Sequence, residues 1–341
     1  MAWWWEDDPA YQAVVRAFVD GDPEDHAGGP LDVRAVVAML SRESKDAFAY
    51  DDIPWDRFPC GPETRDNVAR LRSADANVVY GALRGVHGEL ANSAWSVAAL
   101  AVPFLLRVAA DPDGHHRAYA LELAAGIVQW TPGPGRCTRE TLLRVGDGGW
   151  RYEPSAYVGT WGIEAARDAV AADADLVMAL LDDPDPEVRA AAAYAGVVAS
   201  GRIDDIRDAL HTRFRDEADP AVRAGLVLAL AQLAYVDPAP EHEAWTQALW
   251  ADPAMPPAVR VSAALGWLCL TDAPVPDDLR AVLDACATGE TAQLMKSLPW
   301  MRAVDYDGDT ALQRCVLGLL HPDQAAKPVM DDPWGRPPAF A

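Results

Sequence analysis

A five-residue phrase occurs three times in the second half of the chain and constrains its fold more than any other feature. The three copies are Asp185-Pro186-Glu187-Val188-Arg189, Asp219-Pro220-Ala221-Val222-Arg223 and Pro256-Pro257-Ala258-Val259-Arg260. An aspartate before a helix accepts the free N–H groups of the first turn, proline fits the first helical position, and valine begins a buried stripe. The copies are spaced by roughly 35 residues, the length of one helical hairpin. The phrase therefore predicts a stack of repeated hairpins.

Small residues follow each arginine of the phrase at the same two positions, the second and the sixth. They are Ala191 and Ala195, Gly225 and Ala229, and Ser262 and Gly266. Small side chains at one recurring height allow neighbouring helices to approach closely, as stacked repeats require. No window of the sequence alternates strictly between apolar and polar residues, so strands are not predicted. We therefore expect an all-α fold of the α-solenoid type.

The phrase and its period resemble those of the HEAT-repeat family of armadillo-type α-solenoids, whose inner helices begin with Asp-Pro-x-Val-Arg. The resemblance covers the C-terminal half of the chain well. The stretch 101–105, Ala-Val-Pro-Phe-Leu, with Ala-Ala-Asp-Pro at 109–112, is also similar to poorly characterised HEAT-like proteins of high-GC bacteria. The resemblance implies a right-handed α-solenoid of helical hairpins. The third copy has Pro256 in place of the N-cap aspartate, which puts a continuous Asp-to-Arg ladder in question there.

The helical pattern divides the chain into five predicted regions. They are an N-terminal helical cap region (1–62), N-terminal HEAT-like hairpins (63–130), an irregular insertion (131–162), C-terminal HEAT-like repeats (163–320) and an extended tail (321–341). The insertion is assigned where glycine and proline interrupt the helical period, and the tail is rich in proline. An irregular stretch of this length is unusual as a connection, and insertions into repeat proteins often border the binding face.

The predicted insertion gathers aromatic and basic residues in an otherwise acidic chain. Aromatic and arginine side chains supply most of the energy at protein interfaces. The candidate binding residues are Trp150, Arg151, Tyr152, Tyr157 and Trp161. An equally supported alternative is an Ω-like loop packed by its own aromatic side chains.

The chain of 341 residues carries 29 Lys and Arg residues against 52 Asp and Glu residues, a formal net charge of −23. Such a charge repels nucleic-acid phosphates and anionic lipid surfaces, so neither is an expected ligand. It attracts basic surfaces, which favours a basic protein partner. General solubility is the simpler explanation of the acidity.

The five cysteines are widely spread and form no Cys-x-x-Cys pair, which is typical of a reduced, cytoplasmic protein. The amino terminus has no basic segment of the kind that precedes a secretion signal. The longest apolar stretch, near residues 95–106, is too short to span a bilayer. We expect a cytoplasmic protein without a membrane contact, and the sequence leaves its oligomeric state open.

No motif in the sequence predicts catalysis, a metal or a cofactor. The carboxylates Asp305, Asp307 and Asp309 alternate as in a calcium loop, but the glycine position and the missing glutamate do not fit an EF-hand. A turn with Asp309 as the next N-cap is the favoured interpretation. We therefore expect no bound metal and no cofactor.

The repeat residues Asp185, Arg189, Asp219, Arg223 and Arg260 are expected to be structural. The aspartates would cap helices, and the arginines would form ion pairs between repeats in preference to clamping a substrate.

The sequence leaves two classes of function open. The favoured one is a non-enzymatic protein-binding solenoid that engages a basic partner, with a toxin-neutralising (immunity) or regulatory role as its most concrete form. The alternative is an enzyme on a HEAT-like scaffold, similar to DNA alkyl-base glycosylases or bilin lyases. A glycosylase needs a basic groove, which the net charge disfavours. A bilin lyase needs a tetrapyrrole pocket, which the sequence does not distinguish from packed tryptophans.

Overall fold

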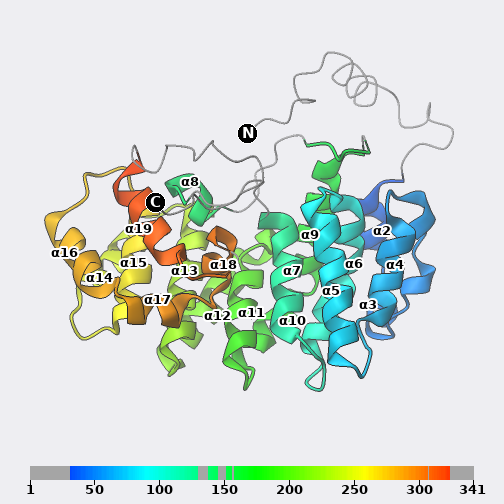
Figure 1. The fold of residues 1–341 in the computed structure, drawn as a ribbon, viewed down its shortest axis with the longest axis horizontal. Coiled ribbons are helices and arrows are strands. Elements are labelled where there is room, and N and C mark those ends of the chain that lie inside the picture. The colour runs from blue at the N-terminus through cyan, green and yellow to red at the C-terminus, as the bar shows by residue number, and fades with distance from the viewer. Residues whose placement is uncertain (1–30, 130–136, 145–150, 156, 306, 323–341) are drawn as a thin grey trace, which may run out of the picture.

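The protein is an array of stacked helices in the computed structural model, which describes residues 31–129, 137–144, 151–155, 157–305 and 307–322 (Figure 1). Within these ranges every regular element is a helix, and the one β-type pairing is an isolated bridge between Tyr152 and Val158. The predicted all-α solenoid class is confirmed. The predicted tail from residue 323 onward and the first 30 residues lie outside the described ranges.

The first part of the array is built around one helix that is buried along almost its whole length. This helix, α6 (Trp95–Ala110), packs most extensively on α7 (Arg117–Gln129) and α9 (Gly159–Ala172). It also contacts α2 (Val33–Met39), α3 (Arg42–Asp46), α4 (Gly61–Arg70) and α5 (Ala76–Ala91). Short 3₁₀ turns at Tyr50–Asp52 and Trp55–Arg57 connect α3 to α4. A helix that is apolar on all sides needs neighbours on all sides, which explains the central place of α6.

Two rows of helices continue the array, an inner row and an outer row. The inner row consists of α7 (Arg117–Gln129), α11 (Pro186–Gly196), α13 (Pro220–Val236) and α15 (Pro257–Leu270). The outer row consists of α9 (Gly159–Ala172), α10 (Ala174–Ala179), α12 (Ile203–Asp216), α14 (Pro240–Ala251) and α16 (Asp277–Cys286), with 3₁₀ turns at Leu180–Asp182 and Ser200–Arg202. Successive inner helices pack against one another. The three repeated phrases therefore begin α11, α13 and α15, as predicted.

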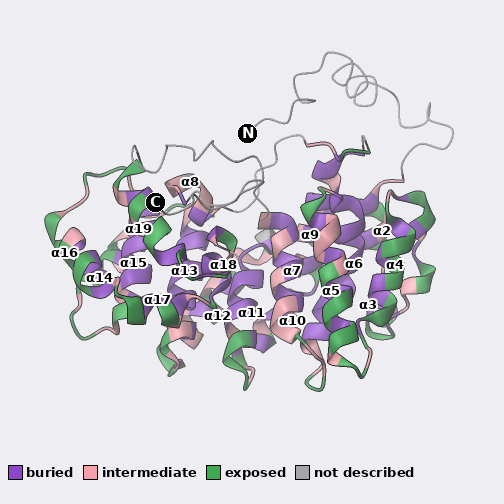
Figure 2. Cartoon of the chain, in the orientation of Figure 1, coloured by how far each residue is buried: buried purple, intermediate pink, exposed green. Residues whose placement is uncertain are grey.

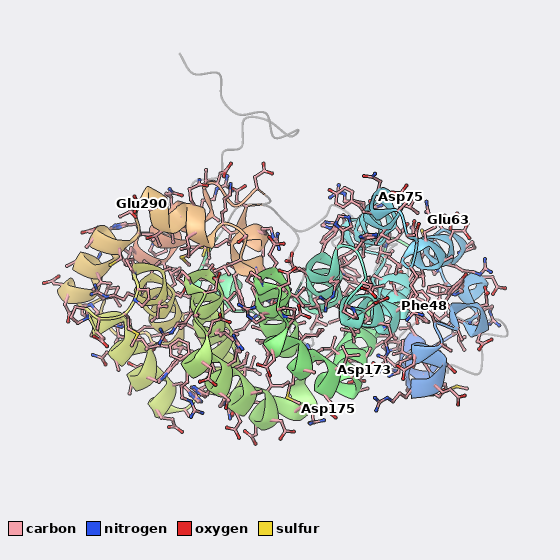
Figure 3. All side chains as sticks on the ribbon, turned by 90° about the horizontal axis from the view of Figure 1, so that it is seen from below. Phe48, Glu63, Asp75, Asp173, Asp175 and Glu290 are labelled. Carbon is pink, nitrogen blue, oxygen red and sulfur yellow. The ribbon has the colours of Figure 1, made fainter. Side chains whose placement is uncertain are left out.

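The last helices do not extend the two rows. Helices α17 (Gly289–Met295), α18 (Pro299–Val304) and α19 (Ala311–Leu320) turn back onto the inner row: α17 packs on α13 and α15, α18 on α11, and α19 on α15. Figure 3 shows the orange C-terminal helices on the inner side of the arc. The helices that end the predicted C-terminal repeat region (163–320) thus lie against the inner row.

A buried tryptophan explains why the C-terminal helices stay on the inner row. Trp300 of α18 is 1% exposed, its ring meets the edge of Tyr194 at 5.0 Å, and its indole N–H donates to Gln232 Oε1 at 2.8 Å. A Cβ at Gly225 would lie 3.2 Å from Leu298 Cδ2, a tight approach, and 3.6 Å from this ring, an ordinary contact. Because α11, α13 and α15 are apolar on their inner sides as well, they require this third layer to exclude water (Figure 2).

The described part of the predicted insertion contains a short helix. This helix packs against helices that come much later in the sequence. Helix α8 (Arg139–Leu142) packs on α15 and α19, and Cys137 and Leu143 beside it are buried. Arg139 donates to the Thr271 carbonyl at 2.7 Å. Glycine is required at Gly318, because a Cβ there would clash with the Cys137 carbonyl oxygen. The chain thus crosses from α7 to the far repeats and returns to α9, which begins at Gly159, before the predicted start at Ile163.

Candidate functional site

The predicted helix caps are present at the first two repeat phrases. The Asp185 carboxylate accepts the Glu187 N–H, and Asp219 accepts those of Ala221 and Val222. A second carboxylate supports each cap, because Asp183 accepts the Asp185 N–H and Glu217 accepts the Asp219 N–H. The repeat motif therefore includes an acidic residue two positions before the N-cap.

This additional acid is the partner of the arginine from the preceding inner helix. Arg189 donates to both oxygens of Glu217, at 2.8 and 3.0 Å, and Glu217 is 4% exposed. Burial alone would raise the pKa of Glu217, but the hydrogen bonds from Arg189 and the Asp219 N–H hold it below its usual value. Arg117, which begins α7, pairs with Asp183 in the same way at 2.5 Å. Arg189 therefore forms an ion pair with the carboxylate that precedes the next repeat phrase.

The other two arginines of the phrase have different partners, which corrects the prediction of ion pairs at all three positions. Arg223 stacks over the Phe214 ring at 4.8 Å from its centre, and Arg260 donates to the Trp250 carbonyl at 3.0 Å. The third phrase begins with Pro256, and Ala254 stands two residues before it, where Asp183 and Glu217 stand in the other copies. Without that acid, Arg223 has no carboxylate to meet at the next junction.

The predicted binding residues of the insertion separate into one core residue and three surface residues. Tyr157 is 3% exposed, and its hydroxyl donates to the Leu31 carbonyl at 2.8 Å and accepts the Val33 N–H at 2.9 Å. It is a packing residue that ties α2 to α9, which corrects its assignment as a contact residue. Arg151, Tyr152 and Trp161 are partly exposed. Trp150 lies outside the described residues.

Trp161 is held in place by its own chain on both sides of the ring. Its ring meets Tyr157 edge to face at 6.0 Å, and the Arg34 guanidinium lies 4.7 Å above it. Arg34 in turn pairs with Asp32 and Glu164 at 2.8 Å each. This arrangement matches the alternative of a loop packed by its own aromatics for these two residues, while leaving part of Trp161 open to solvent.

A buried glutamate anchors the end of the insertion and was not singled out from the sequence. Glu153 is 1% exposed, and its Oε1 accepts the Ser96 N–H at 2.6 Å, so it caps α6 where Ala94 offers no side chain. Burial raises the pKa of Glu153 to about 7, although the hydrogen bonds from Ser96 and Ser155 oppose the rise. A solitary glutamate in an irregular segment carries no signal of this contact in the sequence.

One edge of the array collects the turns that precede the inner helices, and it is acidic. Contacts join these turns in series: His115 Nε2 lies 3.1 Å from the Ala74 carbonyl, Arg117 pairs with Asp183, and Arg189 bridges Asp183 and Glu217. The turns form the lower edge in Figure 1, which Figure 3 views from below with Asp75 labelled. We call the exposed carboxylates on them the acidic edge, which consists of Asp75, Asp113, Asp185, Glu187 and Asp216.

The acidic edge keeps its charge because the nearby arginines are paired elsewhere. Arg117, Arg189 and Arg213 contact Asp183, Glu217 and Asp182. Within the described residues no ion pair joins any of the five acidic-edge carboxylates to a base. The acidic edge therefore presents carboxylates on successive repeats that no described base neutralises through an ion pair.

A second open surface lies on α5 and α7, where the C-terminal helices do not cover the inner row. Tyr80 is 45% exposed, and the Tyr119 hydroxyl lies 2.8 Å from His87 Nδ1. Gly81 and Gly88 on α5 have no other atoms near the place of a Cβ. We call Tyr80, Gly81, His87, Gly88 and Tyr119 the inner patch. In the sequence, the spacing of Tyr80 and His87 places both residues on one face of a helix. A search for histidine metal-binding motifs does not detect this spacing.

Two further findings limit the chemistry of the described residues. No group of three metal-binding side chains among them is arranged to hold an ion, and Asp305 caps the turn before α19 by accepting the Thr310 N–H, where Asp309 was expected to be the cap. None of the described helices has the length and apolar character needed to cross a bilayer.

Comparison with known proteins agrees with the repeat architecture. The HEAT-repeat family model matches residues 175–198, which span α10, the following 3₁₀ turn and α11. No curated protein and no solved structure shows significant similarity to the chain. Residues 175–198 include the first repeated phrase, so the match falls on the motif that predicted the fold. Residues 175–198 are thus similar to a HEAT repeat, and they lie within an array whose described elements are helices.

Proposed function

We propose that this chain is a non-enzymatic binding protein that engages a basic protein partner along its acidic edge. A toxin-neutralising (immunity) or regulatory role is its most concrete form. The observation that carries the proposal is the row of exposed carboxylates on successive turns, from Asp75 to Asp216, which form no ion pair within the described residues. Repeats place such turns at regular intervals, so their charges act together on an extended basic surface. The net charge of −23 supports the same partner chemistry.

The arrangement of the helices favours the acidic edge, over most of the inner face, as the surface that binds a partner. Helices α17, α18 and α19 occupy the inner sides of α11, α13 and α15, where a solenoid commonly holds its ligand. The acidic edge is open beside them. Long-range attraction to this edge would accelerate encounter with a basic partner more than it would add affinity.

The exposed part of the insertion remains the proposed source of local affinity. Arg151, Tyr152 and Trp161 are partly exposed and offer the aromatic and basic side chains that interfaces use as anchors. Tyr157 supports them from within the core. The enzyme alternative gains no specific support, because the described residues bring together no catalytic constellation that we recognise.

Affinity purification from the native host tests the proposal with a matched pair of variants. The edge variant carries Asp185→Asn, Glu187→Gln and Asp216→Asn, and the control variant carries Asp277→Asn, Asp278→Asn and Asp284→Asn on exposed positions of α16. Each removes three negative charges. We expect the wild-type and control proteins to retain one basic protein, identified by mass spectrometry, that the edge variant loses. Capture that survives in the edge variant, or a partner that is acidic, would contradict the proposal.

A further inference from the structure

A cavity opens on the acidic edge between two neighbouring turns, those that join α4 to α5 and α6 to α7. Its volume is about 350 Å³, and its apolar lining includes Leu71 and Val108, each 2% exposed. Arg72, Asp111, Asp113 and His115 provide its polar lining. The cavity therefore combines an apolar lining with charged groups at the surface of the array.

Contacts within the two turns hold the lining in place. The Arg72 guanidinium lies 4.4 Å from the centre of the Phe48 ring, and His115 Nε2 lies 3.1 Å from the Ala74 carbonyl. Asp111 Oδ1 accepts the Asp113 N–H at 3.1 Å, and the Asp111 carbonyl accepts the Gly114 N–H at 2.9 Å. A Cβ at Gly114 would lie 2.9 Å from the Val108 carbonyl oxygen, so glycine keeps this turn tight. These contacts hold the two turns that line the cavity.

The lining selects a ligand that is apolar along its length and cationic at its end. Apolar atoms of the lining exclude water from a hydrocarbon stem, and the two carboxylates of Asp111 and Asp113 outnumber the single cation of Arg72, whose guanidinium stacks on Phe48. Lysine and arginine side chains have this form, with an aliphatic stem and a charged head. A free carboxylate is disfavoured because it would meet Asp111 and Asp113.

We infer that this cavity receives a lysine or arginine side chain of the basic partner, with its stem inside the cavity and its charge beside Asp111 and Asp113. The inference rests on the proposed function and names the anchor point within the acidic edge. It assigns specificity to one place on a surface whose other carboxylates attract the partner over long range.

Binding of blocked amino acids to the full-length chain tests the inference without the partner. The probes are the N-acetyl, N-methylamide derivatives of lysine, arginine and norleucine, and the readout is the backbone amide NMR shift of Val108, Gly114 and His115. Norleucine has the apolar stem without the charge. We expect saturable shifts at these amides with the two cationic probes and at least tenfold weaker binding of norleucine. Equal shifts with norleucine, or shifts confined to other parts of the chain, would overturn the inference.

Two variants with controlled charge separate the cavity from the rest of the edge. In Asp111→Asn with Asp113→Asn, the amide oxygen at position 111 still accepts the turn N–H, so the fold of the turn is expected to persist. We expect this variant to lose about tenfold in affinity for the lysine probe. Asp75→Asn, on the edge but outside the cavity lining, should change it less than about twofold. Equal losses in the two variants would mean general charge attraction and would overturn the inference.

A zwitterionic ligand is the remaining alternative, because Arg72 could meet a carboxylate. Free lysine that binds more tightly than its blocked form, and loses this advantage in Arg72→Gln, would replace the inferred ligand with a free amino acid. The proposed function fails separately: the cationic probes can bind the cavity even if host purification yields no basic partner. Conversely, a partner that depends on the acidic edge while the probes do not bind would leave the proposed function standing and remove the cavity from it.

Discussion

The inner face and the acidic edge are built from the same helices, yet one is closed by the chain and the other is open. The inner sides of α11, α13 and α15 are apolar, and the C-terminal helices bury them with Trp300 at the centre. The turns at the helix starts are polar, and their exposed carboxylates keep their charge because Arg117 and Arg189 are paired with buried acids. The contrast teaches that in this array the edge, more than the inner face, is the surface available to a partner.

Removal of Trp300 should have the largest effect on stability and so tests whether the inner face is truly closed. Trp300→Ala would leave a cavity between α18 and Tyr194 and would remove the indole donor to Gln232 Oε1, at a cost of about 3 to 5 kcal/mol in unfolding free energy. Trp300→Phe keeps most of the apolar contact and should cost about 1 to 3 kcal/mol. Urea denaturation measures both. A cost below about 1 kcal/mol for Trp300→Ala would mean that the C-terminal helices are not firmly packed.

Loss of Arg189 should be the next largest effect, because it leaves the buried Glu217 with fewer partners. Arg189→Ala is expected to cost about 3 kcal/mol, since Arg213 and the Asp219 N–H still contact that carboxylate. Arg223→Ala provides the matched comparison, with only a ring contact to lose, and should cost about 1 kcal/mol. Thermal or urea unfolding of both variants checks the order. If both variants lost the same unfolding free energy, the ion pair of Arg189 with Glu217 would be no more stabilising than the contact of Arg223 with Phe214.

The different partners of Arg189 and Arg223 show what the sequence could and could not predict. The phrase placed the starts of α11, α13 and α15 correctly, because capping and proline preferences act locally. The stacking of Arg223 was also readable in principle, from Ala254 in the place of Asp183 and Glu217. The return of α17–α19 was not, because their apolar positions are the same whether they extend the row or cover it. The crossing of α8 and the burial of Glu153 depend on contacts between residues distant in sequence, which no local pattern encodes.

The Glu153 carboxyl predicts a pH dependence at the point where the insertion meets α6. Its folded-state pKa of about 7 lies above the unfolded value of 4.5, so its contribution to stability is complete below pH 4.5. Between these pH values the unfolded state releases its proton first, so stability falls as pH rises, by up to about 3 kcal/mol. Glu153→Gln should remove this fall while keeping the acceptor for the Ser96 N–H. Urea unfolding from pH 4 to 8 measures it, and parallel curves for the two proteins would contradict the prediction.

Neutralising the acidic edge should have the smallest effect on stability, in contrast to the inner face. Glu187→Gln and Asp216→Asn alter exposed side chains and should each change unfolding free energy by less than about 0.5 kcal/mol. The thermal midpoint of each variant checks this expectation. A large loss at either position would indicate that the acidic edge supports the fold and would weaken its assignment as a binding surface.

The most direct test of the account compares the edge with the open remainder of the inner face in one binding measurement. The affinity of the partner purified from the host is measured by calorimetry at two salt concentrations for the wild type, for the edge variant with Asp185→Asn, Glu187→Gln and Asp216→Asn, and for Tyr80→Ala with Tyr119→Ala on the inner patch. We predict at least a tenfold loss of affinity and a weaker salt dependence for the edge variant, and a change within about twofold for the inner-patch variant. The reverse order would contradict the account and place the partner on the inner patch.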